Sequence, residues 1–175
     1  MILKRITNTS HPMYFEALKL YQISFPYYEQ REKYSQDEII KDNEYHFSLI
    51  YDKNIFVGLV LYWEQQFIYI EHLCILPEMR NKQYGKKTLA LLAEQGKMLI
   101  LEIDPPEDDI SKRRKIFYER CNFTENPFSH IHPPYHKENE GHRLVIMTSP
   151  QKISNDMFDV FSHYLKDRVM KNAFS

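Results

Sequence analysis

Hydrophobic and polar positions change their period along the chain, from a helical pattern near the start to a strand pattern in the middle. Residues 11–24 carry apolar side chains three and four positions apart, which predicts an amphipathic helix. A short strand is expected before it, over residues 1–6. Ser35 or Asp37 is suited to cap a second short helix, which is expected to end near Lys41.

Three consecutive runs rich in β-branched and aromatic residues, at 45–51, 55–63 and 67–76, predict an antiparallel meander with tight polar connections. Pro77 ends the third run because proline cannot donate to a strand ladder. A helix is expected over 83–95, with Gly85, Leu89 and Leu92 on one stripe and Gly96 as its stop.

The second half alternates strands and helices. The pattern predicts a strand at 98–103, a helix at 111–121, a short strand near Phe123, a last strand at 143–148 and an amphipathic helix at 155–171. This order favours parallel pairing in the second half. We therefore expect one α/β domain over residues 1–149, with a mixed sheet of about seven strands flanked by helices. Residues 150–175 are expected to pack on this domain or to form a homodimer contact.

Composition and charge narrow the classes of function. Lys and Arg number 23 against 24 Asp and Glu, so the 175-residue chain has a formal net charge of −1 and no global positive field to recruit nucleic acid. The two cysteines, Cys74 and Cys121, are too few for a disulfide scaffold and favour a reducing, cytoplasmic location. The longest uncharged apolar run, 55–63, is far shorter than the roughly 20 residues of a membrane span.

The segment after the third meander strand carries the chemistry. A buried strand ends at Pro77, a polar loop with Arg80 and Lys82 follows, and a helix begins with Gly85 in its first turn. The unpaired N–H groups and partial positive charge of a helix N-terminus bind phosphate groups. Gly85 is expected to let a diphosphate approach the backbone.

This strand, loop and helix resemble motif A of the GNAT superfamily of N-acetyltransferases, whose signature is Arg/Gln-x-x-Gly-x-Gly/Ala. Arg80 and Gly85 match it, and Gln83 stands where the family usually has glycine. A second segment, Phe117-Tyr118 followed by Asn122-Phe123, is similar to the family's Phe-Tyr-x-x-x-Gly-Phe helix end. Asn122 replaces the usual glycine, and asparagine tolerates the left-handed conformation of a helix C-cap.

The resemblance covers residues 1–149 and implies acetyl-CoA as cosubstrate, bound where the central strands part, and an acetyl group transferred to a primary amine of a small molecule or peptide by direct attack in a ternary complex. The cofactor-binding residues it implies are Cys74, Ile75, Arg80, Asn81, Lys82, Gln83, Tyr84, Gly85, Lys86 and Phe117. A backbone N–H near Cys74 or Ile75 is the expected oxyanion donor.

The same resemblance implies that Tyr118 donates a proton to the departing thiolate. Glu71 is the first choice for the base, directly or through water, since simple alternation places it in phase with Leu73 and Ile75. His72, Glu102 and Glu29 remain alternatives for the base.

Other interpretations of these features are less favoured. The histidines at 130, 132, 136 and 142 suggest a metal site, but no cysteine accompanies them, so no metal is expected. The run 112–115 is typical of a solvated helix face rather than a nucleic-acid site. Cys74 is expected to be a small buried hydrophobe rather than a nucleophile. The alternative function is a catalytically weak CoA-binding or regulatory module of the same fold.

Overall fold

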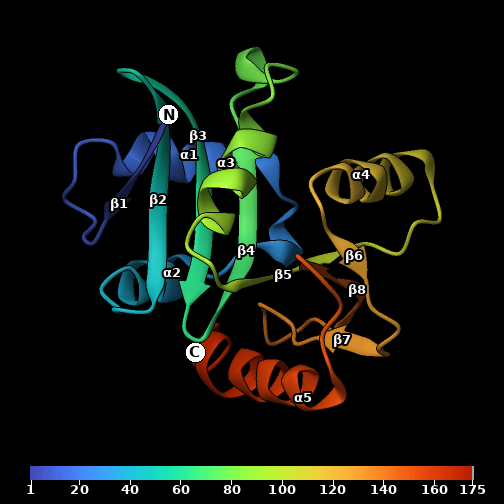
Figure 1. The fold of residues 1–175 in the computed structure, drawn as a ribbon. Coiled ribbons are helices and arrows are strands. Elements are labelled where there is room, and N and C mark those ends of the chain that lie inside the picture. Colours follow the sequence, from blue (N-terminus) through green and yellow to red (C-terminus); the bar gives the residue numbers. More distant parts are fainter. Residues whose placement is uncertain (175) are drawn as a thin grey trace.

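One mixed sheet organises the computed structural model, which describes residues 1–174. Its strand order is β1-β2-β3-β4-β5-β8-β6, and β7 pairs with β8 (Figure 1). The strands are β1 (Ile2–Ile6), β2 (Tyr45–Asp52), β3 (Ile55–Glu64), β4 (Phe67–Ile75), β5 (Met98–Ile103), β6 (Thr124–Glu125), β7 (His130–His132) and β8 (His142–Ser149). The helices are α1 (Tyr14–Ser24), α2 (Lys33–Ile39), α3 (Tyr84–Ala93), α4 (Asp109–Arg120) and α5 (Asn155–Tyr164). Short helical turns lie at Tyr27–Glu29, Pro77–Met79 and Leu165–Val169. The expected mixed sheet flanked by helices is confirmed, with eight strands.

Strand directions follow the prediction in the first half of the chain and depart from it in the second. Strands β1 to β4 pair antiparallel, and β4 pairs parallel with β5. However, β8 pairs antiparallel with both β5 and β6. The expected parallel pairing in the second half is therefore confirmed for β4 and β5 and was wrong for the strands that pair with β8, because the chain between β6 and β8 reverses direction instead of crossing over the sheet.

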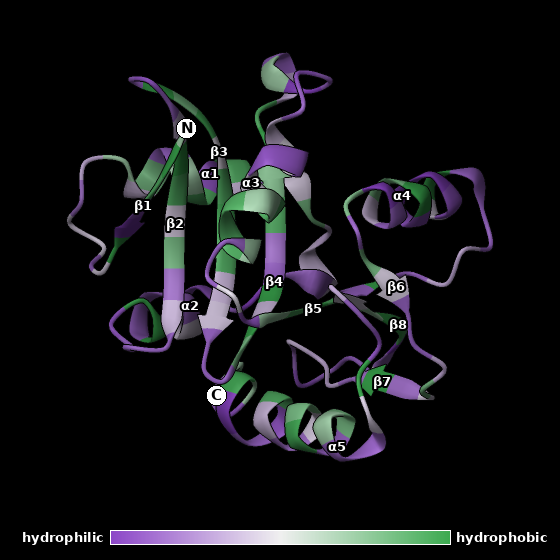
Figure 2. Cartoon of the chain, viewed as in Figure 1, coloured by the Kyte–Doolittle hydropathy of each residue, from purple (hydrophilic) through white to green (hydrophobic). Residues whose placement is uncertain are grey.

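Two apolar clusters cover the two faces of the sheet. One cluster joins α1 and α5 to the sheet through residues such as Tyr21 and Phe161, and the other joins α3 to it through Leu89 and Leu92. Figure 2 shows hydrophobic positions along the central strands and hydrophilic ones on many connections. Among residues 1–174, no helix is long and apolar enough to cross a membrane.

A bulge in β4 changes which residues share a face. Leu61 pairs with His72 but Tyr62 pairs with Ile70, so Glu71 is an extra residue in the ladder. After the bulge, Leu73 packs in the α3-side cluster, whereas Cys74 packs on the α1 side. The expectation that Glu71 is in phase with Leu73 and Ile75 was wrong, because it assumed an unbroken two-residue alternation.

Gln83 and Asn122, which stand where the resembled motifs usually have glycine, both have left-handed backbone in this structure. Asn122 has φ 68° just beyond the end of α4, as its replacement of a C-cap glycine predicts. Gln83 has φ 64° at the N-cap of α3. Glycine adopts this conformation without the steric cost that a Cβ brings, so the usual glycine at this point has a backbone reason.

Candidate active site

The central strands β4 and β5 separate partway along their length. Their parallel pairing runs from Phe67 opposite Met98 to Ile70 opposite Leu101, whereas β4 itself continues to Ile75. A cavity of about 800 Å³ opens at the point of separation. Its lining combines both strands with the loop after α1, one face of α4 and residues 132–135. The separation provides the expected place for a ligand between the strands.

Backbone groups of β4 face this opening. The N–H of Leu76 donates to the Val57 carbonyl at 3.0 Å, so Leu76 is bonded to β3. Because antiparallel strands alternate bonded and outward-facing residues, the amides of Leu73 and Ile75 point away from β3 into the gap. The Arg80 Nε donates to the Ile75 carbonyl at 3.4 Å, which directs this cationic side chain back over the opening. The gap therefore contains backbone donors beside a fixed positive charge.

The loop and the start of α3 lie next to the cavity. No side chain caps the N-terminus of α3, so its first N–H groups face no intramolecular side-chain acceptor. Lys82 and Lys86 are exposed beside it. Tyr84 instead turns toward the β2–β3 connection, where its hydroxyl donates to Asp52 at 2.9 Å. The start of α3 therefore combines uncapped N–H groups with nearby cationic side chains, an arrangement that suits an anion.

The packing of Phe117 against α3 favours glycine at position 85, a contact that was not predicted from the sequence. A Cβ at this position would lie 3.2 Å from Cζ of Phe117, which is tighter than ordinary contact. Gly85 thus permits the close approach of α3 and α4. Its neighbour in the structure is an aromatic ring, and the expectation that its missing Cβ serves a diphosphate stays a prediction.

The expected site residues fall into two groups. Those that line the cavity are Glu71, Cys74, Ile75, Arg80, Phe117 and Tyr118. Those that lie outside its lining, on the loop and the first turn of α3, are Asn81, Lys82, Gln83, Tyr84, Gly85 and Lys86. The second group is placed to contact a ligand that extends beyond the cavity toward α3.

Glu71 is buried at the end of the cavity nearest α1. Its Oε1 accepts hydrogen bonds from Arg31 at 3.1 Å and from the Tyr135 hydroxyl at 2.9 Å, and its Oε2 accepts one from Trp63 Nε1 at 2.8 Å. Burial alone would raise the pKa of the Glu71 carboxyl, but Arg31, His72 and these hydrogen bonds hold it below the ordinary value. The carboxylate is therefore charged and engaged by three donors.

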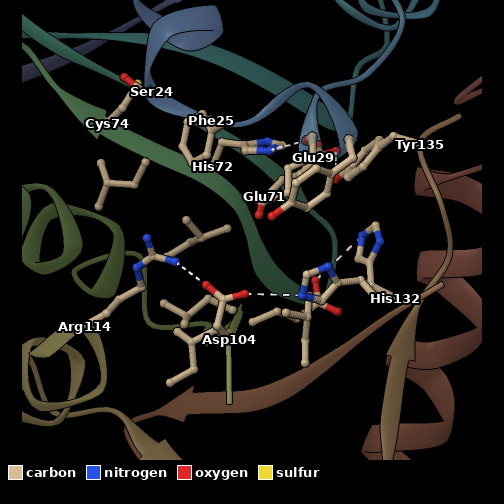
Figure 3. Close-up of a pocket in the computed structure, with 18 of the residues that line it drawn as sticks. Ser24, Phe25, Glu29, Glu71, His72, Cys74, Asp104, Arg114, His132 and Tyr135 are labelled. Atoms are coloured by element: carbon tan, nitrogen blue, oxygen red, sulfur yellow. Dashed lines mark hydrogen bonds and ion pairs between the residues drawn. The ribbon is translucent and has the colours of Figure 1, made fainter. Parts of the chain in front are cut away.

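A second buried carboxylate, Glu102, lies at the end of β5. It accepts from the Tyr69 hydroxyl at 2.5 Å and contacts His130 Nε2, and His132 Nε2 lies 3.8 Å from its Oε2. Figure 3 shows Glu71, His72, His132 and Tyr135 gathered around the same cavity, with the Asp104–Arg114 pair across from them. The α1-side end of the cavity is thus rich in carboxylates and imidazoles.

Sequence reasoning missed two of these groupings. The pairing of Arg31 with Glu71 and the closeness of His132 to Glu102 were not predicted, because these partners are far apart in sequence. The alternation His130-Ile131-His132 was the available signal, since it places both imidazoles on one face of a strand. Among residues 1–174, no group of three or more His, Cys, Asp or Glu side chains could hold a metal ion.

Two further side chains differ in their capacity to react. Burial raises the pKa of the Tyr118 hydroxyl, so it carries its proton at neutral pH. Burial raises the pKa of the Cys74 thiol to about 12, which keeps it protonated and poorly nucleophilic. Tyr118 is therefore protonated at neutral pH, and Cys74 has the character of a packing residue.

Comparison with known proteins agrees with this geometry. Residues 12–123 match the Acetyltransferase (GNAT) family. The chain is 28% identical over 114 residues to YjbC of Bacillus subtilis strain 168, which its name assigns to the acetyltransferases. That match spans 63% of this chain and 56% of YjbC, little more than half of the relative's length.

Solved structures share the fold. A GNAT-family protein of Bacteroides thetaiotaomicron superposes with a TM-score of 0.91 at 28% identity, covering 97% of this chain and 98% of its own. A point mutant of the spermidine N-acetyltransferase SpeG of Vibrio cholerae superposes with a TM-score of 0.60 at 14% identity, over 85% of this chain and 94% of its own. A family match over more than half of the chain, joined to the parted strands and the loop before α3, leads to one conclusion: this protein belongs to the GNAT acetyltransferase family.

Proposed function

We propose that the protein transfers an acetyl group from acetyl-CoA to a primary amine of a small molecule or peptide, by direct attack within a ternary complex. The observation that carries this proposal is the separation of β4 and β5, which turns the amides of Leu73 and Ile75 into a cavity of about 800 Å³. Backbone donors at that point suit the oxygen of a thioester as it gains negative charge.

The residues around the gap fit a CoA thioester. The uncapped N-terminus of α3, preceded by Arg80, Asn81 and Lys82, suits the diphosphate, because N–H groups and cations together bind anionic oxygens. Gln83, Tyr84, Gly85 and Lys86 continue this surface along the first turn. Cys74, Ile75 and Phe117 border the cavity on the way to the reacting carbon. Among neighbours of the same fold, an acetyltransferase from Bacillus subtilis and an aminoglycoside 6'-N-acetyltransferase were solved with CoA.

Each side chain then has a defined task when the cosubstrate supplies its activated acetyl group. Tyr118 donates its proton to the departing thiolate; burial raises the pKa of this hydroxyl, so the proton is present at neutral pH. Glu71 lies at the α1-side end of the cavity, where Arg31, Tyr135 and Trp63 hold its carboxylate in place. The carboxylates and aromatic rings there suit a protonated amine before transfer.

Binding is tested first by thermal unfolding with acetyl-CoA, CoA and dephospho-CoA from micromolar to millimolar concentration. A ligand at one hundred times its Kd adds about 2.7 kcal/mol, so a saturable rise of several degrees in Tm is expected. A flat response to all three compounds contradicts the proposal.

Turnover is tested next with spermidine, an aminoglycoside and a short peptide with a free α-amino group, by following CoA release. At least one amine should give saturable release. Tyr118→Phe should lower kcat about 10²-fold or more while the CoA-induced rise in Tm stays unchanged. Binding without turnover on any amine would favour the alternative, a CoA-binding module with little activity.

A further inference from the structure

The imidazole of His132, a residue of the cavity wall, has one buried nitrogen without a hydrogen-bond partner among the described residues. The residue lies on β7, is only 4% exposed and lines the cavity described above. Its Nδ1 lies 2.6 Å from the Pro133 carbonyl oxygen, which can only accept a hydrogen bond. Nδ1 must therefore carry the proton of the neutral ring, which leaves Nε2 with a free lone pair. That Nε2 is buried and has no hydrogen-bond partner among the described residues.

A fixed carboxylate lies beside this lone pair. Oε2 of Glu102 is 3.8 Å from His132 Nε2. Burial alone would raise the pKa of the Glu102 carboxyl, but His132, His130 and the Tyr69 hydroxyl lower it below the ordinary value. A negative charge at this distance stabilises an imidazolium once a proton arrives. Glu102 Oε2 already accepts the Tyr69 hydroxyl, so His132 Nε2 is the acceptor of this pair that has no partner among the described residues.

The other groups at this end of the cavity are less suited to accept a proton. Glu71 already accepts hydrogen bonds from Arg31, Trp63 and Tyr135. His72 also has a bare nitrogen, Nδ1, but its ring packs between Tyr21 and Phe25. Burial lowers the pKa of His72 to about 4, which disfavours its charged form at neutral pH.

We propose that Nε2 of His132 is the catalytic base that accepts the proton of the acceptor amine, with Glu102 as the residue that positions and stabilises the resulting imidazolium. This inference rests on the proposed acetyl transfer. The amine nitrogen forms a bond to the acetyl carbon and gives one proton to Nε2, while the C–S bond breaks and its electron pair leaves with sulfur. Sulfur takes a proton from Tyr118; afterwards His132 releases its proton to water and the Tyr118 oxygen regains one from water, so both side chains return to their starting state. Charge and protons therefore balance without another reactant.

The tautomer can be measured without knowing the acceptor. Long-range ¹H–¹⁵N spectra of the free protein, assigned with His132→Asn, should show His132 protonated at Nδ1 alone at pH values where the ring is neutral. An Nε2–H tautomer would overturn the proposal whatever the turnover result.

Kinetics supply the second test, on the amine that the screen identifies. His132→Asn retains an amide N–H to donate to the Pro133 carbonyl but removes Nε2, the nitrogen without a hydrogen-bond partner among the described residues. At pH 7, kcat/KM should fall about 10²- to 10⁴-fold, the range for loss of a general base, while the CoA-induced rise in Tm persists. A kcat/KM equal to wild type, or loss of CoA binding in the variant, overturns the assignment.

His136 provides a matched control. Its Nε2 contacts the Tyr27 carbonyl at 2.9 Å, its buried Nδ1 has no hydrogen-bond partner among the described residues, and Glu32 lies 3.8 Å away. This imidazole therefore has surroundings similar to those of His132 but lies outside the cavity lining. His136→Gln should keep kcat/KM within about threefold of wild type, far from the range expected for a lost base. A loss as large as that of His132→Asn would mean that the cavity base is not His132.

The pH profile separates a base from a merely structural histidine. The titratable groups around the His132 ring are Glu102 of β5, Tyr69 and His72 of β4, His130 of β7 and Tyr135. In wild type, kcat/KM should show an inflection at the ionisation of the free-enzyme base, added to the rise with the unprotonated fraction of the amine. In His132→Asn this inflection should vanish, and the rate should keep rising with the fraction of unprotonated amine. An unchanged inflection contradicts the proposal, whereas absence of turnover in wild type would instead overturn the proposed acetyl transfer.

Discussion

At the scale of single residues, the buried pair of Arg31 and Glu71 connects the stability of the protein to its cavity. Both side chains are almost fully buried, at 1% and 2% exposed. Arg31 also donates to the Val169 carbonyl at 2.9 Å and to Ser35. Removing one member of a buried pair costs far more than forming the pair contributes, because the other charge is left without compensation.

Arg31→Met should lower the free energy of unfolding by about 3–5 kcal/mol at pH 7. Arg31 holds the folded pKa of Glu71 below the ordinary 4.5, so the stability from this carboxylate is present above pH 4.5 and is lost as pH falls through the folded value. In the variant the folded pKa rises, so protonation relieves the penalty. The difference between variant and wild type should therefore shrink toward low pH in urea titrations at pH 7 and pH 4.5.

Arg168 gives the control for this experiment. It pairs with Asp42 at 2.8 Å, but its side chain is 43% exposed. Arg168→Met should change the free energy of unfolding by about 0–1 kcal/mol at either pH, as for other surface pairs. A loss for Arg31→Met that matches this small value would show that the buried charge is compensated by some other group.

Individual roles were predictable from sequence only where the local chain determines them. Asn122 was predictable because a C-cap needs left-handed backbone whatever packs around it. Tyr118 was placed in the cavity through the resemblance of its segment. The Arg31–Glu71 pair was not predictable, since it joins residues 40 positions apart and depends on the bulge that turns Glu71 to the α1 side.

At the scale of elements, α5 and the turn after it close the α1 side of the sheet. The amphipathic character expected over 155–171 is confirmed: Phe161 of α5 and Leu165 and Val169 of the following turn are each 1% exposed or less. The Phe161 ring packs against Phe67 and Tyr69, with ring centroids 6.0 and 5.2 Å apart. Because Tyr69 donates to Glu102, this packing also supports the cavity.

Phe161→Ala should lower the free energy of unfolding by about 3–5 kcal/mol, the usual cost of a large cavity in an aromatic core. The neighbouring Val160 is 42% exposed, and Val160→Ala should stay within about 0.5 kcal/mol of wild type. Guanidinium unfolding of both variants measures the difference. Equal, small losses would mean that α5 is only loosely attached to the sheet.

Most elements were predictable because their periods are long and regular, and the exceptions have physical causes. Strand β7 is three residues long and pairs only with β8, so it has too few positions to show a period. The bulge in β4 is invisible to an alternating pattern, because it is defined by the partner strand. The antiparallel direction of β8 depends on the path of the chain between β6 and β8, which no local pattern determines.

At the scale of the whole molecule, the separation of β4 and β5 divides the sheet into two parts. One part is the antiparallel set β1 to β4, and the other consists of the shorter strands β5 to β7 together with β8. The parts stay paired only over 67–70 and 98–101. The proposed ligand would occupy the remaining opening and contact both. Binding should therefore slow exchange locally rather than across the sheet.

Hydrogen exchange with and without acetyl-CoA tests this arrangement. Amides at Leu73 and Ile75 and in the first turn of α3 should exchange at least tenfold more slowly with ligand, since they would gain partners or be shielded from water. That factor corresponds to about 1.4 kcal/mol of local stabilisation. Rapidly exchanging amides of residues 7–13, between β1 and α1 at the far edge of the sheet, should not change. Protection at that distant edge without protection in β4 would place the ligand elsewhere.

The contact between Arg31 and the Val169 carbonyl also bears on how the chain acquires its structure during synthesis. Trp63, Phe67 and Tyr69 emerge from the ribosome about 100 residues before the segment that covers them, which corresponds to roughly 5–20 s at about 5–20 residues per second. During that time the nascent sheet exposes an aromatic surface. The Arg31–Glu71 pair beside it still lacks the Val169 carbonyl, to which Arg31 donates in the folded protein. The growing chain is therefore a natural client for chaperones that hold apolar surfaces apart, and its α1 side is completed only once the last helical turn has been made.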